Sequence, residues 1–284
     1  MLHDAHNHLQ DEALASHLDR VASAWPDLAG VGGEMVVNGT HPDDWPRVAA
    51  LAVAHAFVRP AYGLHPWDVG ASRPSDWLVQ LASRLDAEPR ASVGEIGLDR
   101  WILDSAAPDD PRLGGVRPAS MHEQAEVFGA QFALAAARNR PVTVHCLQAF
   151  GELLPLLRAQ PAPARGFLLH AYGGSAEMAG ELVRLGAYFS FNPAFLDRRK
   201  AARQETFRAI PEDRLLCETD APAMPPPPVW RTHKLPPGPD GFAPNHPGNI
   251  EAAYAGLAAL RGVTEAALTG RIAENFIRFF GPPR

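Results

Sequence analysis

The sequence predicts an α/β protein in which eight strands alternate with helices and close into one (β/α)8 barrel. Three observations support this prediction. Strand-like and helix-like segments alternate along the chain with no boundary between them. The length of 284 residues, of which 46% are hydrophobic, suits one barrel domain spanning residues 1–284. Several predicted strands end in His, Asp or Glu, as expected for a TIM-type barrel with its site at the carboxyl ends of the strands.

An open, doubly wound sheet is the alternative arrangement of alternating strands and helices. It is disfavoured because no glycine-rich phosphate loop follows the first strand, where the chain reads HNHLQDE. Two smaller domains would fit the length as well, but no linker divides the chain. The barrel is therefore the preferred prediction.

The predicted strands are short apolar segments that end in polar residues or turns. The second reads Met-Val-Val before a turn, and the fifth is rich in β-branched residues. In chain order, strands are expected at residues 1–9, 35–39, 59–66, 91–99, 141–146, 166–173, 187–192 and 214–220.

The predicted helices carry apolar residues at spacings of three and four. In residues 11–25, Leu14, Leu18 and Val21 share one face, and Asp11 is suited to cap the first turn. Thr264 begins the last helix in the same way. Helices are expected at residues 11–25, 42–56, 75–88, 120–138, around 152–158, 175–185, 198–210, 249–260 and 264–280.

Two long segments lack both patterns. Residues 100–118 are rich in Asp, Pro and Gly and are long enough to overhang a site. Residues 221–249 hold ten prolines in 29 positions, too many for regular structure. Because they follow Asp220 directly, they are more than a linker, although the sequence leaves their role open.

Composition excludes several classes of protein. The net charge of −6 argues against broad, non-specific wrapping of nucleic acid but leaves room for a small basic patch. Cys146 and Cys217 are too few for a disulfide scaffold, fit a reducing compartment, and are expected to pack as inert side chains. No segment approaches about 18 apolar residues, and no basic region precedes an apolar run. A soluble, cytoplasmic protein without a membrane segment is expected.

The first strand indicates a metal site. Because side chains alternate along a strand, Asp4, His6 and His8 are expected to point to one face. Two imidazoles at i and i+2 can bind one metal ion, and Asp4, one layer deeper, could orient a ligand. The alternative is a polar strand start with ordinary histidines. The other strand ends decide between the two interpretations.

Metal-capable residues end five of the predicted strands. Singly, each has a structural explanation, such as a hydrogen-bonded His or an Asp that caps a turn. Together they offer the imidazole nitrogens and carboxylate oxygens that Zn²⁺ or Mn²⁺ accepts. One ion needs only three or four ligands, so six predict two ions, with Glu95 between them because each of its oxygens can bind one. The six are His6, His8, Glu95, His145, His170 and Asp220.

Over nearly its whole length the chain resembles the TatD-related metal-dependent hydrolases, a branch of the amidohydrolase superfamily. The resemblance rests on several motifs, each weak alone and strong together. They are residues 4–9 (DAHNHL), 63–66 (GLHP), 93–99 (VGEIGLD), 144–146 (VHC), 169–175 (LHAYGGS), 216–222 (LCETDAP) and 245–247 (NHP).

The resemblance implies two divalent ions (Zn, Mn or Mg) and a role for each matching position. Asp220 would also take the proton of the attacking water. Glu218 shares strand parity with Asp220 and is expected behind the ligands. His65 is either a contact to a substrate phosphate or leaving group, or a loop-packing histidine. The first ion would be held by His6, His8 and Asp220, and the second by His145 and His170, with Glu95 bridging the two.

The resemblance implies a deoxyribonuclease that hydrolyses phosphodiester bonds as a 3′–5′ exonuclease, acting on DNA ends or short single strands. One alternative is a dinuclear hydrolase of small amides, esters or lactones, which the same centre could perform. The other is a non-catalytic interaction protein, which would have no need of six polar ligands in one cleft.

Two departures from the family pattern concern phosphate recognition. No Arg follows His145, where residues 145–150 read HCLQAF, and the end of the seventh strand, FSFNPAF at 189–195, is bulkier than usual. Other cations could substitute, although a solvated charged surface explains them equally well. The candidates are Arg100, Arg198, Arg199, Lys200, Arg231 and Lys234.

Overall fold

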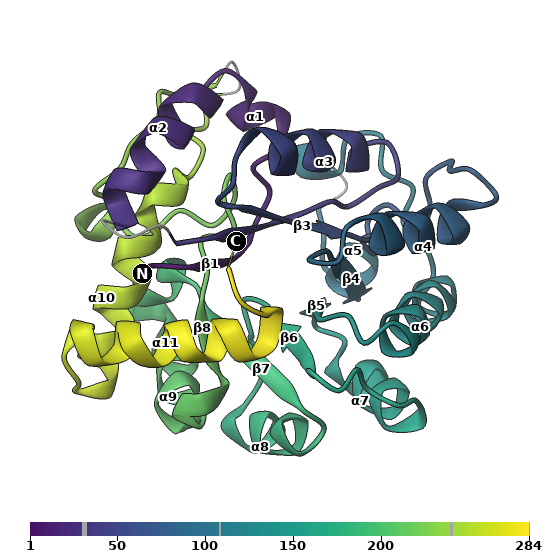
Figure 1. Ribbon diagram of the computed structural model, residues 1–284. Coiled ribbons are helices and arrows are strands. Elements are labelled where there is room, and N and C mark those ends of the chain that lie inside the picture. Colours follow the sequence, from purple (N-terminus) through teal and green to yellow (C-terminus); the bar gives the residue numbers. More distant parts are fainter. Residues whose placement is uncertain (30–32, 108, 239–240, 284) are drawn as a thin grey trace.

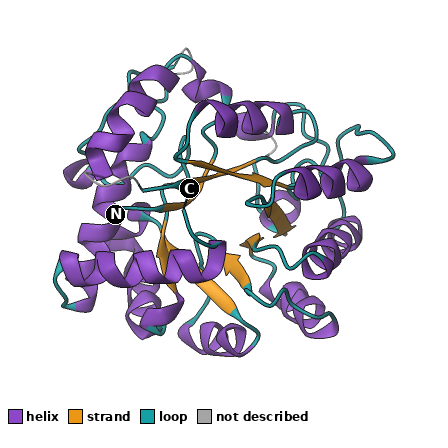
Figure 2. Ribbon diagram, in the orientation of Figure 1, coloured by secondary structure: helices purple, strands orange, loops and turns teal. Residues whose placement is uncertain are grey.

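The computed structural model describes residues 1–29, 33–107, 109–238 and 241–283, and within them eight parallel strands form the predicted barrel. Each strand pairs with the next in sequence order. Helices surround the strands (Figures 1 and 2). The strands are β1 (Asp4–Asn7), β2 (Met35–Asn38), β3 (Val58–Tyr62), β4 (Ser92–Asp99), β5 (Val142–Leu147), β6 (Phe167–Leu169), β7 (Ala187–Phe191) and β8 (Leu215–Cys217).

The helices of the described residues follow the strands in the expected alternation. They are α1 (Glu12–Ala15), α2 (Leu18–Ala29), α3 (Trp45–Ala54), α4 (Trp77–Ala87), α5 (Trp101–Asp104), α6 (Met121–Ala137), α7 (Phe150–Ala159), α8 (Ala176–Arg184), α9 (Ala201–Ala209), α10 (Ile250–Arg261) and α11 (Glu265–Phe280). Short 3₁₀ turns lie between them: η1 (Pro111–Leu113), η2 (Pro193–Leu196), η3 (Arg198–Lys200), η4 (Glu212–Arg214), η5 (Pro228–Trp230) and η6 (Pro247–Asn249).

Several predicted elements differ from the structure in their bounds, and two of the differences change where the chain turns. The helix expected at 11–25 is two helices, because the His17 amide donates to Leu14 O (2.9 Å) and tightens the chain into a turn. Strand eight, expected to reach Asp220, ends at Cys217, and Asp220 lies beyond it with a left-handed φ of 55°. The caps were correctly predicted: Asp11 accepts from Ala13 N, and Thr264 from Ala267 N.

The two segments expected to be irregular are largely so. The described residues of 100–118 contain α5 and η1, and those of 221–249 contain η5, η6 and an isolated bridge between Lys234 and Asn245. Cys217 is fully buried in the core and Cys146 is partly buried against it. Burial raises the pKa of both thiols, so neither is a reactive thiolate, as expected.

Helix α11 closes the amino-terminal end of the barrel. Its Phe276, Phe279 and Phe280 pack with inward apolar side chains of the strands, among them Leu168 and Leu216. Figure 1 shows α11 crossing in front of the barrel. The buried Arg59 guanidinium donates to the carbonyl oxygens of Phe280 and Pro282 (2.8 Å each) and pairs with Glu34. With this end filled, the opposite end is left for the site.

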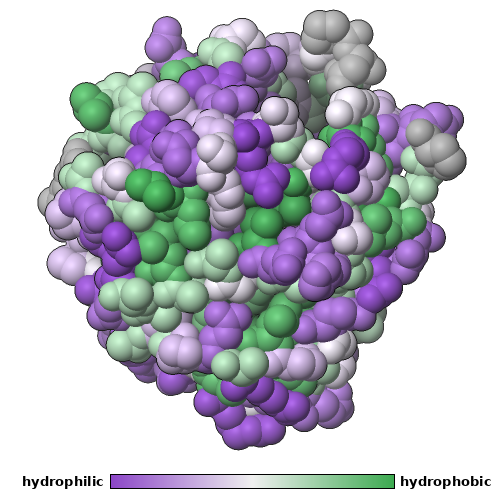
Figure 3. Space-filling view, turned by 90° about the vertical axis from the view of Figure 1, so that its right-hand side faces the viewer, coloured by the Kyte–Doolittle hydropathy of each residue, from purple (hydrophilic) through white to green (hydrophobic). Residues whose placement is uncertain are grey.

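None of the described helices is long and apolar enough to cross a membrane. Figure 3 shows one face of the molecule, where apolar patches are bordered by hydrophilic side chains. Most large apolar side chains that are exposed lie far apart in the sequence, such as Val53, Val229 and Phe242.

The packing of α11 makes His3 an acid-sensitive position. Its ring stacks on Phe276 (4.1 Å between centroids), and its Nδ1 accepts from Glu34 N (3.1 Å). Burial, followed by nearby positive charge, lowers the pKa of His3 to about 4. Above pH 6.5 the residue is neutral in both states. As the pH falls from 6.5 to 4, only the unfolded chain takes up the proton, so stability is lost in this window.

We therefore expect the unfolding free energy of the His3→Asn variant to fall less than that of the wild type between pH 7.5 and pH 4. Asn keeps an acceptor for Glu34 N but cannot titrate, and the difference should approach about 3 kcal/mol. Urea unfolding at several pH values measures it. His122→Asn, at an exposed position on α6, is the control. A gap between wild type and His3→Asn that stays constant with pH would contradict the prediction.

Candidate metal centre

The six predicted ligands come together at the carboxyl ends of the strands. His6 lies in β1 and His8 just after it, while Glu95 and His145 lie in β4 and β5. His170 follows β6 directly, and Asp220 follows β8 by three residues. Four of the six side chains are buried, and His8 and His145 keep only 15% of their side-chain surface exposed.

The first group of ligand atoms surrounds one oxygen of Glu95. The Nε2 atoms of His6 and His8 lie 3.2 Å apart, and each is 3.5 Å from Asp220 Oδ1. The same two nitrogens lie 3.4 and 3.2 Å from Glu95 Oε2. His6, His8 and Asp220 therefore form one group of possible metal ligands, and its two imidazoles also lie close to Glu95 Oε2.

The second group surrounds the other oxygen of Glu95. His145 Nδ1 is 2.9 Å and His170 Nε2 is 2.7 Å from Glu95 Oε1. These two nitrogens lie 3.2 Å apart. His65 Nε2 also reaches the same oxygen, at 3.3 Å. Glu95 thus lies between two clusters, one on each carboxylate oxygen.

The spacing and chemistry of both groups fit divalent cations. Ligand bonds of about 2.1 Å in a tetrahedral site leave about 3.4 Å between ligand atoms. The separations of His6 from His8, of His6 from Asp220 and of His145 from His170, at 3.2, 3.5 and 3.2 Å, lie near this value. Imidazole nitrogen with carboxylate oxygen is the donor set that Zn²⁺ and Mn²⁺ accept. These clusters could hold metal ions without a change of fold.

Charge around Glu95 supports the same fit. Burial alone would raise the pKa of the Glu95 carboxyl, but the charges of His170, His65 and His6 hold it well below its usual range. Burial alone would lower the pKa of His170, but the Glu95 and Glu218 carboxylates raise it well above its usual value. Buried, ionised carboxylates that attract positive charge provide the environment that a cation requires.

Neighbouring groups fix which ring nitrogen faces each cluster. His8 Nδ1 donates to the carbonyl oxygen of Asn38 (2.8 Å), which leaves Nε2 to accept a cation. His145 is reversed: its Nε2 lies 3.2 Å from Asp99 Oδ2, so Nδ1 faces the cluster. Asp99 is itself fixed by the Trp67 indole (2.6 Å) and the Ile102 amide (3.0 Å).

The barrel closes at the same place. Beyond the ends of β1 and β8, Asp220 N donates to His6 O (2.9 Å) and His8 N donates to Ala221 O (2.7 Å). The Asp4 carboxylate accepts from the amide and hydroxyl of Thr219, at 3.0 and 2.6 Å. The seam between the first and last strands is thus built from the residues that carry the first cluster.

His6 and His8 point to one place, with their Nε2 atoms 3.2 Å apart, but the expected alternation does not extend to Asp4. The pairing of β1 with β2 shifts register between Asp4 and Asn7, which breaks the alternation. Asp4 therefore hydrogen-bonds Asn7, Thr219 and the His6 amide rather than a ligand ring.

The family is shown by comparison with known proteins. The sequence profile of the TatD related DNase family matches residues 3–281. The chain belongs to this family. YabD of Bacillus subtilis, described as an uncharacterized metal-dependent hydrolase, is 29% identical over 99% of this chain and 99% of its own length. The 3′-5′ ssDNA/RNA exonuclease TatD of Klebsiella pneumoniae is 29% identical over 89% of this chain and 88% of its own.

Solved structures agree with the fold of this TatD-family chain. The crystal structure of YJJV, a TatD homolog from Escherichia coli, superposes with a TM-score of 0.81 and 27% identity, covering 99% of this chain and 98% of that one. The (β/α)8 prediction is therefore confirmed, and the doubly wound alternative is wrong.

In this TatD-family chain, Glu218 lies directly after β8 and behind the second cluster. The Glu218 carboxylate accepts from Ser190 and Asn192 and is fully buried. Its Oε1 lies 3.9 Å from His170 Nδ1, which has no hydrogen-bond partner in the described chain. The bulky end of β7 that departs from the family pattern thus supplies the two donors that hold Glu218.

Sequence reasoning gave no role to Asp99 or to the carbonyl of Asn38. One signal for Asp99 was available: it lies four residues after Glu95 at the end of the same strand, an even spacing. The contact from Asn38 comes from the backbone, which no residue pattern reveals.

The cations proposed for phosphate recognition have different surroundings in the structure. Arg100 is paired with Asp104 and Glu152, and Arg199 with Asp197. Lys234 instead lines a cavity, together with Arg20, which sequence reasoning had not considered.

Proposed function

We propose that this chain is a metal-dependent nuclease that removes nucleotides from the 3′ ends of single-stranded DNA. The observation that carries the proposal is the pair of ligand clusters on the two oxygens of Glu95, in a chain of the TatD related DNase family. The name of the Klebsiella relative, a 3′-5′ ssDNA/RNA exonuclease, supports the substrate class and the direction.

Two divalent ions would be held by the two clusters. His6 Nε2, His8 Nε2 and Asp220 Oδ1 would bind the first, with Glu95 Oε2. The second would be bound by His145 Nδ1 and His170 Nε2, with Glu95 Oε1. When bound, the ions lower the pKa of a water from 15.7 toward neutrality and polarise the phosphodiester.

Asp220 is the proposed proton acceptor. Burial alone would raise the pKa of its carboxyl, but hydrogen bonding to His6 and His8 lowers it below its usual value, so the group is ionised and able to accept. It takes the proton of the attacking water as the water oxygen bonds to phosphorus, and returns it to the strand oxygen that leaves as the phosphorus–oxygen bond breaks. The strand loses one nucleotide per cycle.

His65 is proposed to contact the substrate. Its ring lies 10% exposed at the edge of the second cluster, 3.3 Å from Glu95 Oε1. Its Nδ1 accepts from the Trp67 amide (3.2 Å), so Nε2 carries a proton and can donate to a phosphate oxygen.

The dinuclear proposal predicts two divalent ions per chain under metal-replete conditions. Glu95→Gln should lower the occupancy of both sites, because an amide bridges two cations poorly, whereas His145→Ala should lower only one. Elemental analysis of dialysed protein measures both. Finding no more than one ion in the wild type, with His145→Ala unchanged, would exclude two ions.

The nuclease proposal predicts cleavage of single strands with a free 3′ end and none of covalently closed circles. Asp220→Asn should reduce the rate by at least about 10²-fold, because a proton acceptor and a metal contact are lost together. Gel mapping of end-labelled strands and circles, with metal-loaded wild type and variant, measures this. Equal cleavage of circles rules out end trimming. No cleavage of any oligonucleotide with both ions bound would favour a hydrolase of small esters or amides.

Asp99 should affect the metal affinity of the site that contains His145 and not that of the other site. Asp99→Asn removes the charge behind His145 Nε2, and losing such a partner typically costs about 10–100-fold in metal affinity. Zinc titration by calorimetry should show a lower affinity at the site of His145 and His170 and an unchanged affinity at the other site. The control is Asp109→Asn, an exposed carboxylate on the loop that follows. Equal effects of the two variants would show that Asp99 has no specific role.

A further inference from the structure

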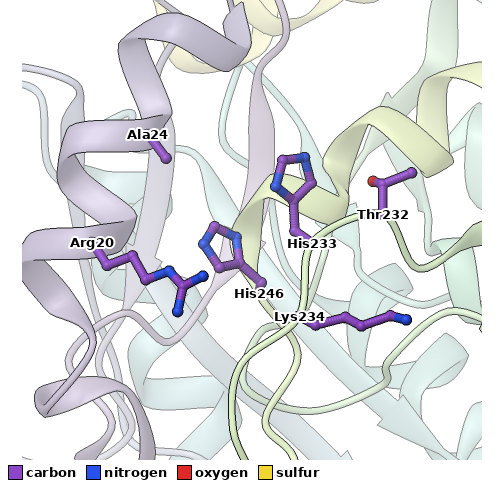
Figure 4. Close-up of a pocket in the computed structure, with 6 residues that line it drawn as sticks. All are labelled: Arg20, Ala24, Thr232, His233, Lys234 and His246. Carbon is purple, nitrogen blue, oxygen red and sulfur yellow. The ribbon is translucent and has the colours of Figure 1, made fainter.

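A small cavity lies between helix α2 and the proline-rich segment that follows β8. Its volume is about 280 Å³, and it is lined by Arg20, Ala24, Thr232, His233, Lys234 and His246. Figure 4 shows the Arg20 side chain extending from α2 toward the imidazole of His246 on the opposite wall. Drug-sized ligands occupy pockets of about 300–1,000 Å³, so this cavity suits a smaller group.

The cavity presents hydrogen-bond donors and no acid. None of its lining residues is Asp or Glu. Across the described residues, no carboxylate lies within ion-pair distance of Arg20 or Lys234, whereas Arg100, Arg112 and Arg199 each have such a partner. Two cations of a net acidic chain thus line one hollow, and neither pairs with a carboxylate that the structure describes.

His246 is the buried donor of the cavity. The residue is 3% exposed, and its Nδ1 accepts from the Gly248 amide (2.8 Å). Burial, and then the charges of His233 and Arg20, lower the pKa of His246 to about 4, so the neutral ring carries its proton on Nε2. No partner for Nε2 lies among the residues that the structure describes, and the ring faces the cavity. An acceptor from outside the chain would satisfy it.

The neighbouring ring of His233 is already engaged. It stacks on His246 (5.2 Å between centroids), and its Nε2 pairs with Glu251 Oε2 at 3.1 Å. His233 therefore fixes the plane of His246, and the free donors are His246, Arg20, Thr232 and Lys234.

The wall of the cavity is hydrogen-bonded to the metal centre. Asn245, the residue before His246, donates from its side chain to Thr219 O (3.0 Å) and from its amide to Pro222 O (2.8 Å). Asp220 lies between these two acceptors. The other wall, α2, follows the strand that carries His6. The two walls of the cavity thus adjoin β1 and β8 in sequence, the strands at whose ends the first cluster lies, whereas His145 and His170 come from β5 and the end of β6.

We propose that this cavity binds a backbone phosphate of the single-stranded substrate, at a linkage upstream of the one that is cleaved. The proposal rests on the nuclease function and deepens it by adding a second contact point for the strand. Arg20 and Lys234 supply charge, and His246 Nε2 and the Thr232 hydroxyl donate to the phosphate oxygens. It explains how the chain recognises phosphate without an Arg after His145.

The test compares three charge-neutralising variants of the full-length, metal-loaded protein. Arg20→Gln and Lys234→Gln remove the two cations at surface positions, where folding is not at risk. Arg184→Gln, at the end of α8 and the opposite end of the barrel, makes the same charge change. The two cavity variants should raise KM for a single-stranded oligonucleotide about three- to tenfold, with kcat unchanged. The p-nitrophenyl ester of thymidine 5′-phosphate, which has no second phosphate, should react as with wild type.

A methylphosphonate scan identifies the phosphate itself. Each internal phosphate of the oligonucleotide is replaced in turn by a neutral methylphosphonate, and kcat/KM for loss of the 3′ nucleotide is measured. In the wild type and in Arg184→Gln, one linkage upstream of the scissile bond should be sensitive. In Arg20→Gln that sensitivity should be lost, because the two changes remove one shared contact. The slope of log KM against log[salt] should also become shallower by about 0.7.

Each remaining outcome overturns the proposal. If Arg20→Gln and Lys234→Gln match Arg184→Gln, the cavity does not contact the strand. If they weaken only inhibition by inorganic phosphate, with the scan profile intact, the cavity binds the free anion alone. If all proteins carry both ions and none cleaves an oligonucleotide, the proposed nuclease function fails, and the cavity's role with it.

Discussion

The closure between the first and last strands is the contact on which the rest of the site depends. Asp4 accepts two hydrogen bonds from Thr219, and the backbones of His6 and Asp220 bond directly. These few bonds, together with that between His8 N and Ala221 O, join parts of the chain more than 200 residues apart. They also set the separation of ligands that come from opposite ends of the sequence. If the barrel closed one residue out of register, the same side chains would be present but the first cluster would not form. Side chains alternate along a strand, so such a shift would turn ligands to the opposite face.

Glu95 organises the site from its centre, between the two ligand clusters. A single buried carboxylate with imidazoles around both oxygens is stable only while positive charge compensates it, since an unpaired buried charge costs several kcal/mol. The surrounding imidazoles supply that charge in the protein alone, and divalent cations would supply it more fully. The outer contacts of Asn38 and Asp99 then decide which nitrogen His8 and His145 turn inward. Ligand type, ring orientation and charge therefore all favour the same occupant.

The order of the elements and the gathering of six polar residues at one end of the barrel could be predicted, because both follow from periodicities of two and 3.6 residues. The shift in β1 that turns Asp4 away from His6 could not, because a bulge depends on what the neighbouring strands require. The break in the helix predicted over residues 11–25 could not be predicted either, because the apolar spacing continues across Ser16 and His17 while the backbone turns there. Asp99 escaped notice because it touches a ring and not the centre of the cluster. The cavity lined by Arg20 and His246 lies between α2 and the proline-rich segment, and no sequence periodicity predicts that these two segments meet.

The position of the cations that line the cavity bears on how a strand would be recognised. A protein with a continuous basic groove can bind a strand anywhere along its length. This chain has a net charge of −6, and Arg100 and Arg199 are held in ion pairs, whereas Arg20 and Lys234 of the proposed phosphate cavity pair with no described carboxylate. The metal clusters would cleave the strand and the cavity would only bind it. Because the two contact points differ, a strand held at both can lie in one direction only. The walls of the cavity adjoin in sequence the strands that lead to His6 and Asp220, so a strand held at both points would enter from that side and present its terminal linkage to Glu95. A preference for the ends of strands would then follow from the positions of the metal clusters and the phosphate cavity.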